Sequence, residues 1–378
     1  MERVFAGILL LTWLFAATNC SQPENSRTVS IPTPSHSGHT PASSLSESDL
    51  SSLDQLLRDA LPSLGGGAAL LLLDSERVLY RKAFGNLTID QVLPIASATK
   101  WLSGALILSL VDEGNLSLDD SVAQYLPDFT EQKTQITIRQ LFAHTSGLPP
   151  EASCRNNRAT SLEDCAKAIA RVPLQAEPGA TFHYGGVSMH VGGRVAEVAT
   201  GKAWNDIFIE RIAGPLGMQQ TDYHAYGATQ NPRPAGDARS SLDEYGRFLQ
   251  MLLNRGVFEG RRVLSPEAVA EMLRDQTDGA ALTYTIFHDK GHLDPDLPKA
   301  RYGLGVWLEK HDSDTGEVLE ASSPGALGAY PWLDLGNNIG GIILTRNTFS
   351  RSLPVYLKVK REYQEKLQAK GNSRISAG

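Results

Sequence analysis

The chain has 378 residues, 41% of them hydrophobic, and a formal net charge of −7 at pH 7. This length and apolar content allow a buried core in one large domain or in two interleaved ones. The negative charge and the lack of a sustained basic run argue against nucleic acid as a partner.

The first 20 residues, MERVFAGILLLTWLFAATNC, have the pattern of a bacterial export signal. Arg3 supplies a positive start, and the apolar stretch from Val4 to Ala17 is too short for a comfortable membrane span. The ending AATNC resembles a lipoprotein signal, in which Cys20 is acylated and attaches the chain to a membrane, although Asn19 is unusual before such a cysteine. We therefore expect an exported protein: a periplasmic or outer-membrane-anchored lipoprotein, or a secreted protein if Cys20 carries no lipid.

Residues 21–47 are rich in Ser, Pro and Thr and poor in large apolar side chains, which predicts a flexible tether. A single folded domain is then predicted for residues 48–378. Its first helix is expected to begin near Ser48 or Asp49, because leucines follow at helical spacing at Leu50, Leu53, Leu56, Leu57 and Leu61.

A β-hairpin is predicted next, with a buried strand from Ala68 to Leu73, a turn at Asp74 and Ser75, and a returning strand from Val78 to Phe84. The stretch PIASATKWLSGALIL then opens a helix that ends near Gly114, where a glycine suits the C-cap.

The remainder of the chain is predicted to be helical in the middle and rich in strands towards its end. Helices separated by turns occupy about Thr137 to Gly217, and a final amphipathic helix runs from about Pro354 to Leu367. Between them RYGLGVWLEK, GALGAYPWLD and IGGIILTRN have the composition of strands. This order predicts an α/β (α+β) sandwich, with an antiparallel sheet flanked by terminal helices and a mostly helical subdomain.

Cys154 and Cys165 form an even pair once Cys20 is set aside. In an exported protein they are close enough in sequence to close a small loop as a disulfide. Two buried thiols are the alternative.

Ser97 and Lys100 stand at positions i and i+3 of the predicted helix and therefore share a face. The N-terminus of a helix carries partial positive charge, which favours a serine alkoxide and can place a backbone N–H against an oxyanion. The apolar segment that follows would desolvate Lys100, favour its neutral form and let it act as a base. The pattern Ser-x-x-Lys is weak by itself, and a solvated lysine is its alternative interpretation.

Several segments from about residue 50 onward resemble, in the same order, those of a family of serine hydrolases. They include PIASATKWLSGALILSLVDEGNLSLDDSVAQYLP, TIRQLFAHTSGLP, EPGATFHYGG, YGLGVW and PGALGAYPWLD. The family comprises class C β-lactamases, family VIII esterases, D-aminopeptidases and penicillin-binding-protein carboxypeptidases. The resemblance implies the β-lactamase/transpeptidase-like fold, although one fold hosts many functions.

The resemblance implies that Ser97 is the acylated nucleophile, Lys100 its partner base and Tyr184 the group that passes the proton to the leaving group. The family's second motif is Tyr-x-Asn, whereas this chain reads FHYGG and has Gly186 at the asparagine position. In relatives that asparagine orients the lysine and, in β-lactamases, contacts the acylamino group of the substrate.

The family's third motif, Lys-Thr-Gly or His-x-Gly on a strand beside the nucleophile, corresponds here to Ser323, Pro324 and Gly325. Gly325 keeps the close backbone approach, and the backbone N–H groups of Ser97 and Ala326 are expected to form the oxyanion hole. The cation is missing, and Pro324 offers neither a hydroxyl nor an N–H. The family's usual anchor for a substrate carboxylate is therefore absent at this point.

These departures matter most for penicillins and for peptides with a free carboxylate, because each charge-assisted hydrogen bond contributes about 1.5–3 kcal/mol. We therefore expect a serine hydrolase with esterase-like activity on a small-molecule ester or amide. The alternatives are a β-lactamase-type amidase or a peptidase acting on cell-wall or D-amino-acid material, and an inactive binding protein on the same fold.

No metal and no cofactor are expected. Among the histidines, His144 is expected to support a turn, His183 is considered as a substitute cation, and His288 and His292 are placed in a loop rather than in a metal site. Trp332 is expected to pack in the core, with the pocket wall as the alternative. The polar segment from about 274 to 299 is expected to shape the active-site rim.

Overall fold

The computed structural model describes residues 45–282 and 301–375. The export signal, Cys20, nearly all of the tether, His288, His292 and most of the predicted rim segment lie outside these ranges and stay predictions. Within the described ranges, no helix combines the length and the apolar character needed to cross a membrane.

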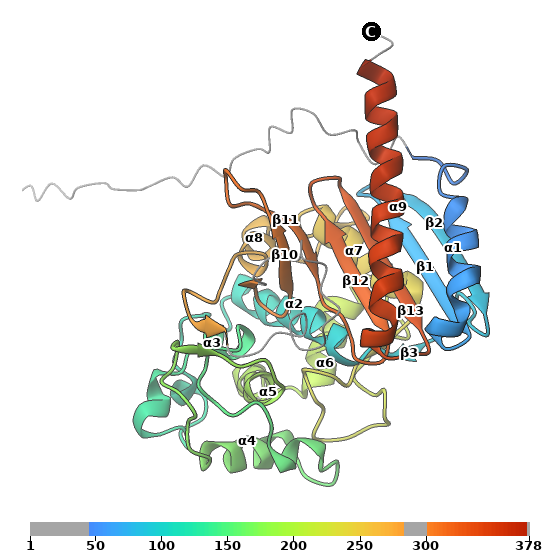
Figure 1. Cartoon of the computed structure of the whole chain (residues 1–378). Helices are drawn as coiled ribbons and strands as arrows, with labels where there is room; N and C mark the ends of the chain where they lie inside the picture. Colours follow the sequence, from blue (N-terminus) through green and yellow to red (C-terminus); the bar gives the residue numbers. More distant parts are fainter. Residues whose placement is uncertain (1–44, 283–300, 376–378) are drawn as a thin grey trace, which may run out of the picture. The chain divides into compact units, whose positions relative to one another are not determined.

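In residues 45–282 and 301–375, seven strands form one antiparallel sheet in the order β2-β1-β13-β12-β11-β10-β9 (Figure 1). Their bounds are β1 Gly67–Leu73, β2 Val78–Gly85, β9 Arg301–Tyr302, β10 Trp307–His311, β11 Val318–Ser322, β12 Ala329–Asp334 and β13 Ile339–Thr345. The predicted hairpin is β1 and β2, and Asp74 closes its turn by accepting the N–H groups of Glu76 and Arg77. Because β1 pairs with β13, strands from the beginning and the end of the domain lie side by side in the sheet.

Two helices cover one face of this sheet: α1 (Ser52–Ala60) and α9 (Phe349–Ile375) (Figure 1). They bury a cluster that includes Leu53 and Tyr356 against Leu70 and Ile343. The opposite face carries α2 (Thr99–Asp112), α7 (Leu242–Leu253) and α8 (Pro266–Met272), whose apolar side chains join Leu71 and other residues of the main core. Every residue of β1 is buried because both of its faces are covered.

The middle of the chain supplies the predicted helical region. Its helices are α3 Ile138–Phe142, α4 Leu162–Ala170, α5 Val187–Thr200 and α6 Trp204–Phe208, the last continuing into a π-helical turn at Ile209–Ala213. Two short strand pairs join segments distant in the chain: β3 Leu93–Pro94 with β5 Arg239–Ser240, and β4 Thr181–Phe182 with β8 Ala281–Leu282. A third pair, β6 Val257–Phe258 with β7 Arg261–Arg262, is a local hairpin. The predicted class, an α/β sandwich with an antiparallel sheet and a helical subdomain, is confirmed.

Helix α2 lies unusually close to the loop that precedes β10. A Cβ atom added at Gly104 would stand 2.1 Å from the carbonyl oxygen of Leu304, and one added at Gly305 would stand 2.2 Å from that of Lys100. Gly305 also has φ +82°, a backbone conformation that glycine adopts without steric cost. These contacts hold the first turns of α2, and with them Ser97 and Lys100, against the sheet.

The terminal helices differ from the predicted bounds. Before α1, residues 46–51 form turns in which Asp49 accepts the N–H of Ser46, so the helix begins at Ser52 rather than at Ser48. The last helix begins at Phe349, five residues before Pro354. A proline in the second turn removes only one backbone hydrogen bond, which the packing of this helix on the sheet outweighs.

A buried ionic cluster fastens α9 to the sheet. The ammonium group of Lys360 lies 2.9 Å from Glu309 Oε2 and forms an ion pair with Glu320. Tyr330 donates a hydrogen bond of 3.0 Å to the Glu309 carboxylate. Burial by itself would lower the pKa of Lys360, but the surrounding negative groups raise this pKa well above its ordinary value. The lysine is therefore charged in the folded protein.

We predict that Lys360→Met lowers the free energy of unfolding by about 3–5 kcal/mol, because it leaves two buried carboxylates without their cation. Lys358→Met, an exposed position on the same helix, is the matched control and should change stability little. Urea denaturation followed by circular dichroism measures both, and equal losses in the two variants would contradict the interpretation.

Candidate active site

The described part of the chain contains a pocket of about 770 Å³ that collects residues distant in sequence. Its lining includes all three predicted catalytic residues, Ser97, Lys100 and Tyr184, together with Ala326. The lining also contains side chains that the sequence did not single out, among them Glu151, Arg155 and Arg233. Because these side chains carry charge, they bear on which substrates the pocket can accept.

Ser97 is half-buried in a 3₁₀ turn, Ala96–Ala98, that leads directly into α2. Ala96 has φ +46°, a left-handed conformation that costs free energy in a residue with a Cβ atom and is often found at functional sites. The turn is held from behind, because Tyr245 donates a 2.8 Å hydrogen bond to the Ala98 carbonyl and the Ala238 N–H donates to Thr99 Oγ1 at 3.1 Å. The serine hydroxyl is therefore fixed at the N-terminal end of the helix.

Lys100 is only 3% exposed, and its Nζ lies 3.1 Å from Ser97 Oγ and 3.0 Å from the carbonyl oxygen of Ala235. Burial, and to a smaller extent the positive charge of Arg155, lower the pKa of the Lys100 ammonium to about 7, while the negative charge of Glu151 opposes this shift. A neutral amine can donate to Ala235 and keep its lone pair for the Ser97 hydroxyl proton. The geometry therefore suits a general base.

Tyr184 presents its ring to Lys100, whose Nζ lies 4.5 Å from the ring centroid. Behind it lies a cluster of rings, with Trp307 at 5.0 Å and His144 at 4.9 Å between centroids. His144 is 1% exposed and is not part of the pocket lining. Burial is the main reason that the pKa of His144 lies well below its ordinary value, and the charges of Lys100 and Arg155 contribute to the same shift. This imidazole therefore stays neutral.

The residues predicted from the third motif lie in the turn between β11 and β12 rather than within a strand. Ser323 is buried, and its hydroxyl donates to the carbonyl oxygens of Ser97 and Gly305, each at 3.3 Å. A Cβ atom added at Gly325 would stand 2.0 Å from the Ile95 carbonyl oxygen, so this position accepts only glycine. Ser323, Pro324 and Gly325 thus support the Ser97 turn from below, and Ala326 is the first residue to reach the pocket.

Of the other residues singled out in the sequence, one lines the pocket and one lies in the core. His183 lines the pocket, and its backbone N–H donates to the His144 carbonyl at 2.8 Å. Trp332 is fully buried on the α9 face of the sheet, where its Nε1 donates to the Tyr363 hydroxyl at 3.2 Å, so it packs in the core and forms no part of the pocket wall. Within residues 45–282 and 301–375, no three His, Cys, Asp or Glu side chains gather as a metal ion would require.

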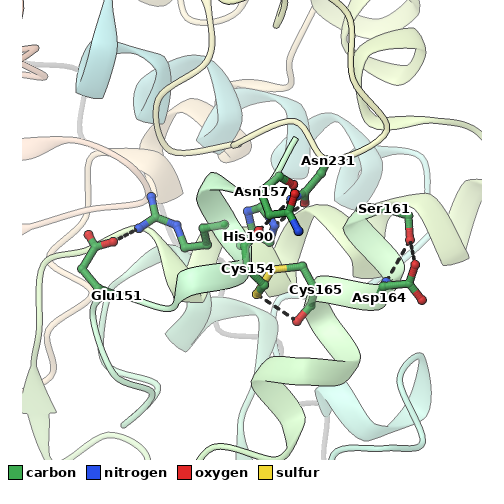
Figure 2. Close-up of a disulfide and its surroundings, with 9 residues drawn as sticks. Glu151, Cys154, Asn157, Ser161, Asp164, Cys165, His190 and Asn231 are labelled. Carbon is green, nitrogen blue, oxygen red and sulfur yellow. Dashed lines mark hydrogen bonds and ion pairs between the residues drawn. A yellow bond between two sulfur atoms is a disulfide. The ribbon is translucent and has the colours of Figure 1, made fainter. Parts of the chain in front are cut away.

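Gly186, at the asparagine position of the second motif, is the N-cap of α5 and lies against the guanidinium of Arg155. Arg155 comes from a 3₁₀ turn, Ser153–Asn156, that a disulfide between Cys154 and Cys165 joins to α4 (Figure 2). Sequence reasoning missed Arg155, since its distance from Tyr184 along the chain gave no reason to connect the two. The glycine at an expected asparagine position was the one available signal.

Comparisons with known proteins identify the family and the fold of the chain. A family model described as Beta-lactamase matches residues 57–361. Penicillin-binding protein 4 of Amycolatopsis lactamdurans is 30% identical over 243 residues, which cover 55% of this chain and 63% of that protein. The chain thus spans less than two thirds of the length of this curated relative.

Two solved structures share the fold. A Bacteroides dorei protein, described provisionally as a β-lactamase, is 32% identical with a TM-score of 0.72, over 82% of this chain and 99% of its own. A family VIII carboxylesterase gives a TM-score of 0.66 at 18% identity, over 84% of this chain and 98% of its own, and this likeness concerns the fold alone. The chain belongs to the β-lactamase family, the serine hydrolases that share their fold with penicillin-binding proteins.

Proposed function

We propose that this protein is an exported serine hydrolase that cleaves small-molecule esters through an acyl-enzyme on Ser97. The observation that carries the proposal is the buried Lys100 amine, which lies 3.1 Å from Ser97 Oγ and has a pKa of about 7. An amine with this pKa is substantially neutral near pH 7 and can accept a proton, which a solvated lysine cannot do.

The reaction begins when Ser97 Oγ bonds to the acyl carbon and its proton passes to Lys100. The backbone N–H groups of Ser97 and Ala326 stabilise the oxyanion of the tetrahedral intermediate. The proton then reaches the leaving group through Tyr184, whose ring lies over the lysine amine, as the bond from the acyl carbon to the leaving group breaks. Water next attacks the acyl-enzyme, releases the acid and restores the Ser97 hydroxyl.

The preference for esters rests on the two departures from the family motifs. Gly186 supplies no amide to hold an acylamino group, and Ser323 is committed to backbone carbonyls below the pocket. An ester with a good leaving group requires neither contact. The charged side chains in the pocket favour a second candidate, an amidase or peptidase, and an inactive binding protein is the third outcome that an experiment must distinguish.

Export, with lipid attachment at Cys20 or secretion, belongs to the same proposal and rests on the sequence of residues 1–20. The disulfide between Cys154 and Cys165 supports it, because disulfides persist in oxidising compartments.

Ser97→Ala should abolish covalent labelling by a fluorophosphonate probe and reduce hydrolysis of 4-nitrophenyl esters by roughly 10⁴- to 10⁶-fold, because the proposed acyl-enzyme forms on the Ser97 hydroxyl. The matched control is Ser109→Ala, which changes a serine near the C-terminal end of α2 and should retain labelling. Unlabelled but correctly folded wild-type protein would favour the binding-protein alternative. Rapid turnover of nitrocefin would instead favour the amidase.

The rate of ester hydrolysis should rise with pH through a midpoint near 7 and then reach a plateau, because only neutral Lys100 accepts the Ser97 proton and its pKa is about 7. The midpoint should move to higher pH in Arg155→Met, since the charge of Arg155 contributes to the lowering of this pKa. The measurement is kcat/KM for a neutral 4-nitrophenyl ester between pH 5 and 10 at constant ionic strength. A midpoint near the ordinary lysine pKa would overturn the assignment of Lys100 as the base.

A further inference from the structure

Gly186 has no side chain, and the guanidinium of Arg155 occupies the space that a side chain at this position would fill. A Cβ atom built at Gly186 would lie 1.9 Å from Arg155 Nη2 and 2.2 Å from its Cζ. Any larger side chain at position 186, including the asparagine found in relatives, therefore excludes the guanidinium from its present position. Compared with the family's second motif, this chain lacks the asparagine amide at position 186. The Arg155 guanidinium, a permanent positive charge, lies in the same wall of the pocket.

The turn that carries Arg155 is held rigidly. Cys154 is bonded to Cys165 of α4, and the Asn231 side chain donates hydrogen bonds of 2.9 Å to the carbonyls of Cys154 and Asn157 (Figure 2). Asn231 Oδ1 lies 2.7 Å from His190 Nε2 of α5, the helix that Gly186 caps. Burial lowers the pKa of His190 to about 3, so this imidazole is neutral and donates from Nε2. Both ends of the contact between Arg155 and Gly186 are thus tied to the same helix.

Arg155 is incompletely neutralised for a side chain that is only 8% exposed. Its ion-pair partner is Glu151, whose side chain is 69% exposed, and ion pairs with so exposed a partner are weak. Its Nε has no hydrogen-bond partner among the described residues. By contrast, Arg233, the other arginine in the lining, is held by the fully buried carboxylate of Asp237 through a 2.6 Å hydrogen bond from Nε.

From this arrangement we propose that Arg155 is a substrate-binding residue that selects acyl compounds bearing a carboxylate near the scissile bond. The guanidinium offers planar paired donors that match a carboxylate, and Glu151 can swing into solvent to release them. The inference rests on the proposed hydrolase function of Ser97 and names its substrate class. The cation that relatives carry in the third motif is missing here, and the Arg155 guanidinium supplies a positive charge beside Gly186 of the second motif instead.

The test compares two substrates that differ only in charge, mono-4-nitrophenyl adipate and its methyl ester. The measured quantity is the charge preference, the ratio of kcat/KM for the acid to that for the methyl ester, on the alkaline plateau where Lys100 is neutral. Wild-type protein should prefer the acid. Arg155→Met should lower this ratio by roughly 10- to 100-fold, the value of a charge-assisted hydrogen bond.

Two further variants give the proposal independent support or contradiction. Gly186→Ala should lower the charge preference by displacing the guanidinium without removing it, and its φ of −121° tolerates alanine. Glu151→Gln should raise the preference a few-fold, because it removes the competing carboxylate. Arg171→Met, on the exposed end of α4, controls for the loss of one positive charge and should leave the ratio as in the wild type.

The pair 4-acetoxybenzoate and methyl 4-acetoxybenzoate places the carboxylate on the leaving group instead of the acyl group. A preference that depends on Arg155 in either pair supports the proposal and shows which side of the scissile bond the arginine faces. A ratio that Arg155→Met and Gly186→Ala leave unchanged in both pairs overturns it, while continued ester turnover would leave the Ser97 function intact.

Binding to Ser97→Ala protein separates the two proposals. Isothermal titration with mono-4-nitrophenyl adipate should give an affinity that falls about 10-fold or more when Arg155→Met is added. If wild-type protein hydrolyses none of the esters but this affinity still depends on Arg155, the hydrolase function fails and the carboxylate site stands. If turnover is present and the affinity is independent of Arg155, the carboxylate site fails and the hydrolase function stands.

Discussion

The desolvation of one amine is the interaction on which the rest of the site depends. Lys100 is buried because the close approaches at Gly104 and Gly305 press α2 against the loop before β10, and because Ala235 covers its ammonium group and accepts its hydrogen bond. Removed from water and next to another cation, the amine loses its preference for the charged form. A solvated lysine at the same distance from Ser97 would be a permanent cation and no base.

The candidate site brings together the three proposed catalytic residues and places a positive charge in one wall of the pocket. Ser97, Lys100 and Tyr184 meet in one pocket, and the turn after β11 supports the serine through Ser323 and Gly325 without supplying a cation. The positive charge enters instead from a disulfide-bound turn next to α5. Because the same charge also lowers the pKa of Lys100, the residue proposed to bind substrate and the residue proposed as the base are electrostatically coupled.

Much of the fold could be predicted from local patterns. The hairpin β1–β2 follows from an apolar run, a turn and a second run, and these elements form by pairing between neighbours in sequence. Helix ends were less predictable. The turns before Ser52 are held by the hydrogen bond that the Asp49 side chain accepts from the Ser46 N–H, and the extension of α9 to Phe349 depends on packing against the sheet. Both effects override the local signals of leucine spacing and of Pro354.

By itself, the sequence determined which residues to propose for the chemistry: the spacing of Ser97 and Lys100 predicts that they share one helical face, and the ordered family segments point to Tyr184 and Ala326. Only the tertiary structure decided what surrounds them. Contacts between segments far apart in the chain place Arg155 against Gly186 and bury Lys100. Such contacts also engage the Ser323 hydroxyl in hydrogen bonds to backbone carbonyls below the pocket. Burial and charge are properties of the assembled site, since both depend on which distant groups exclude water and how near they lie.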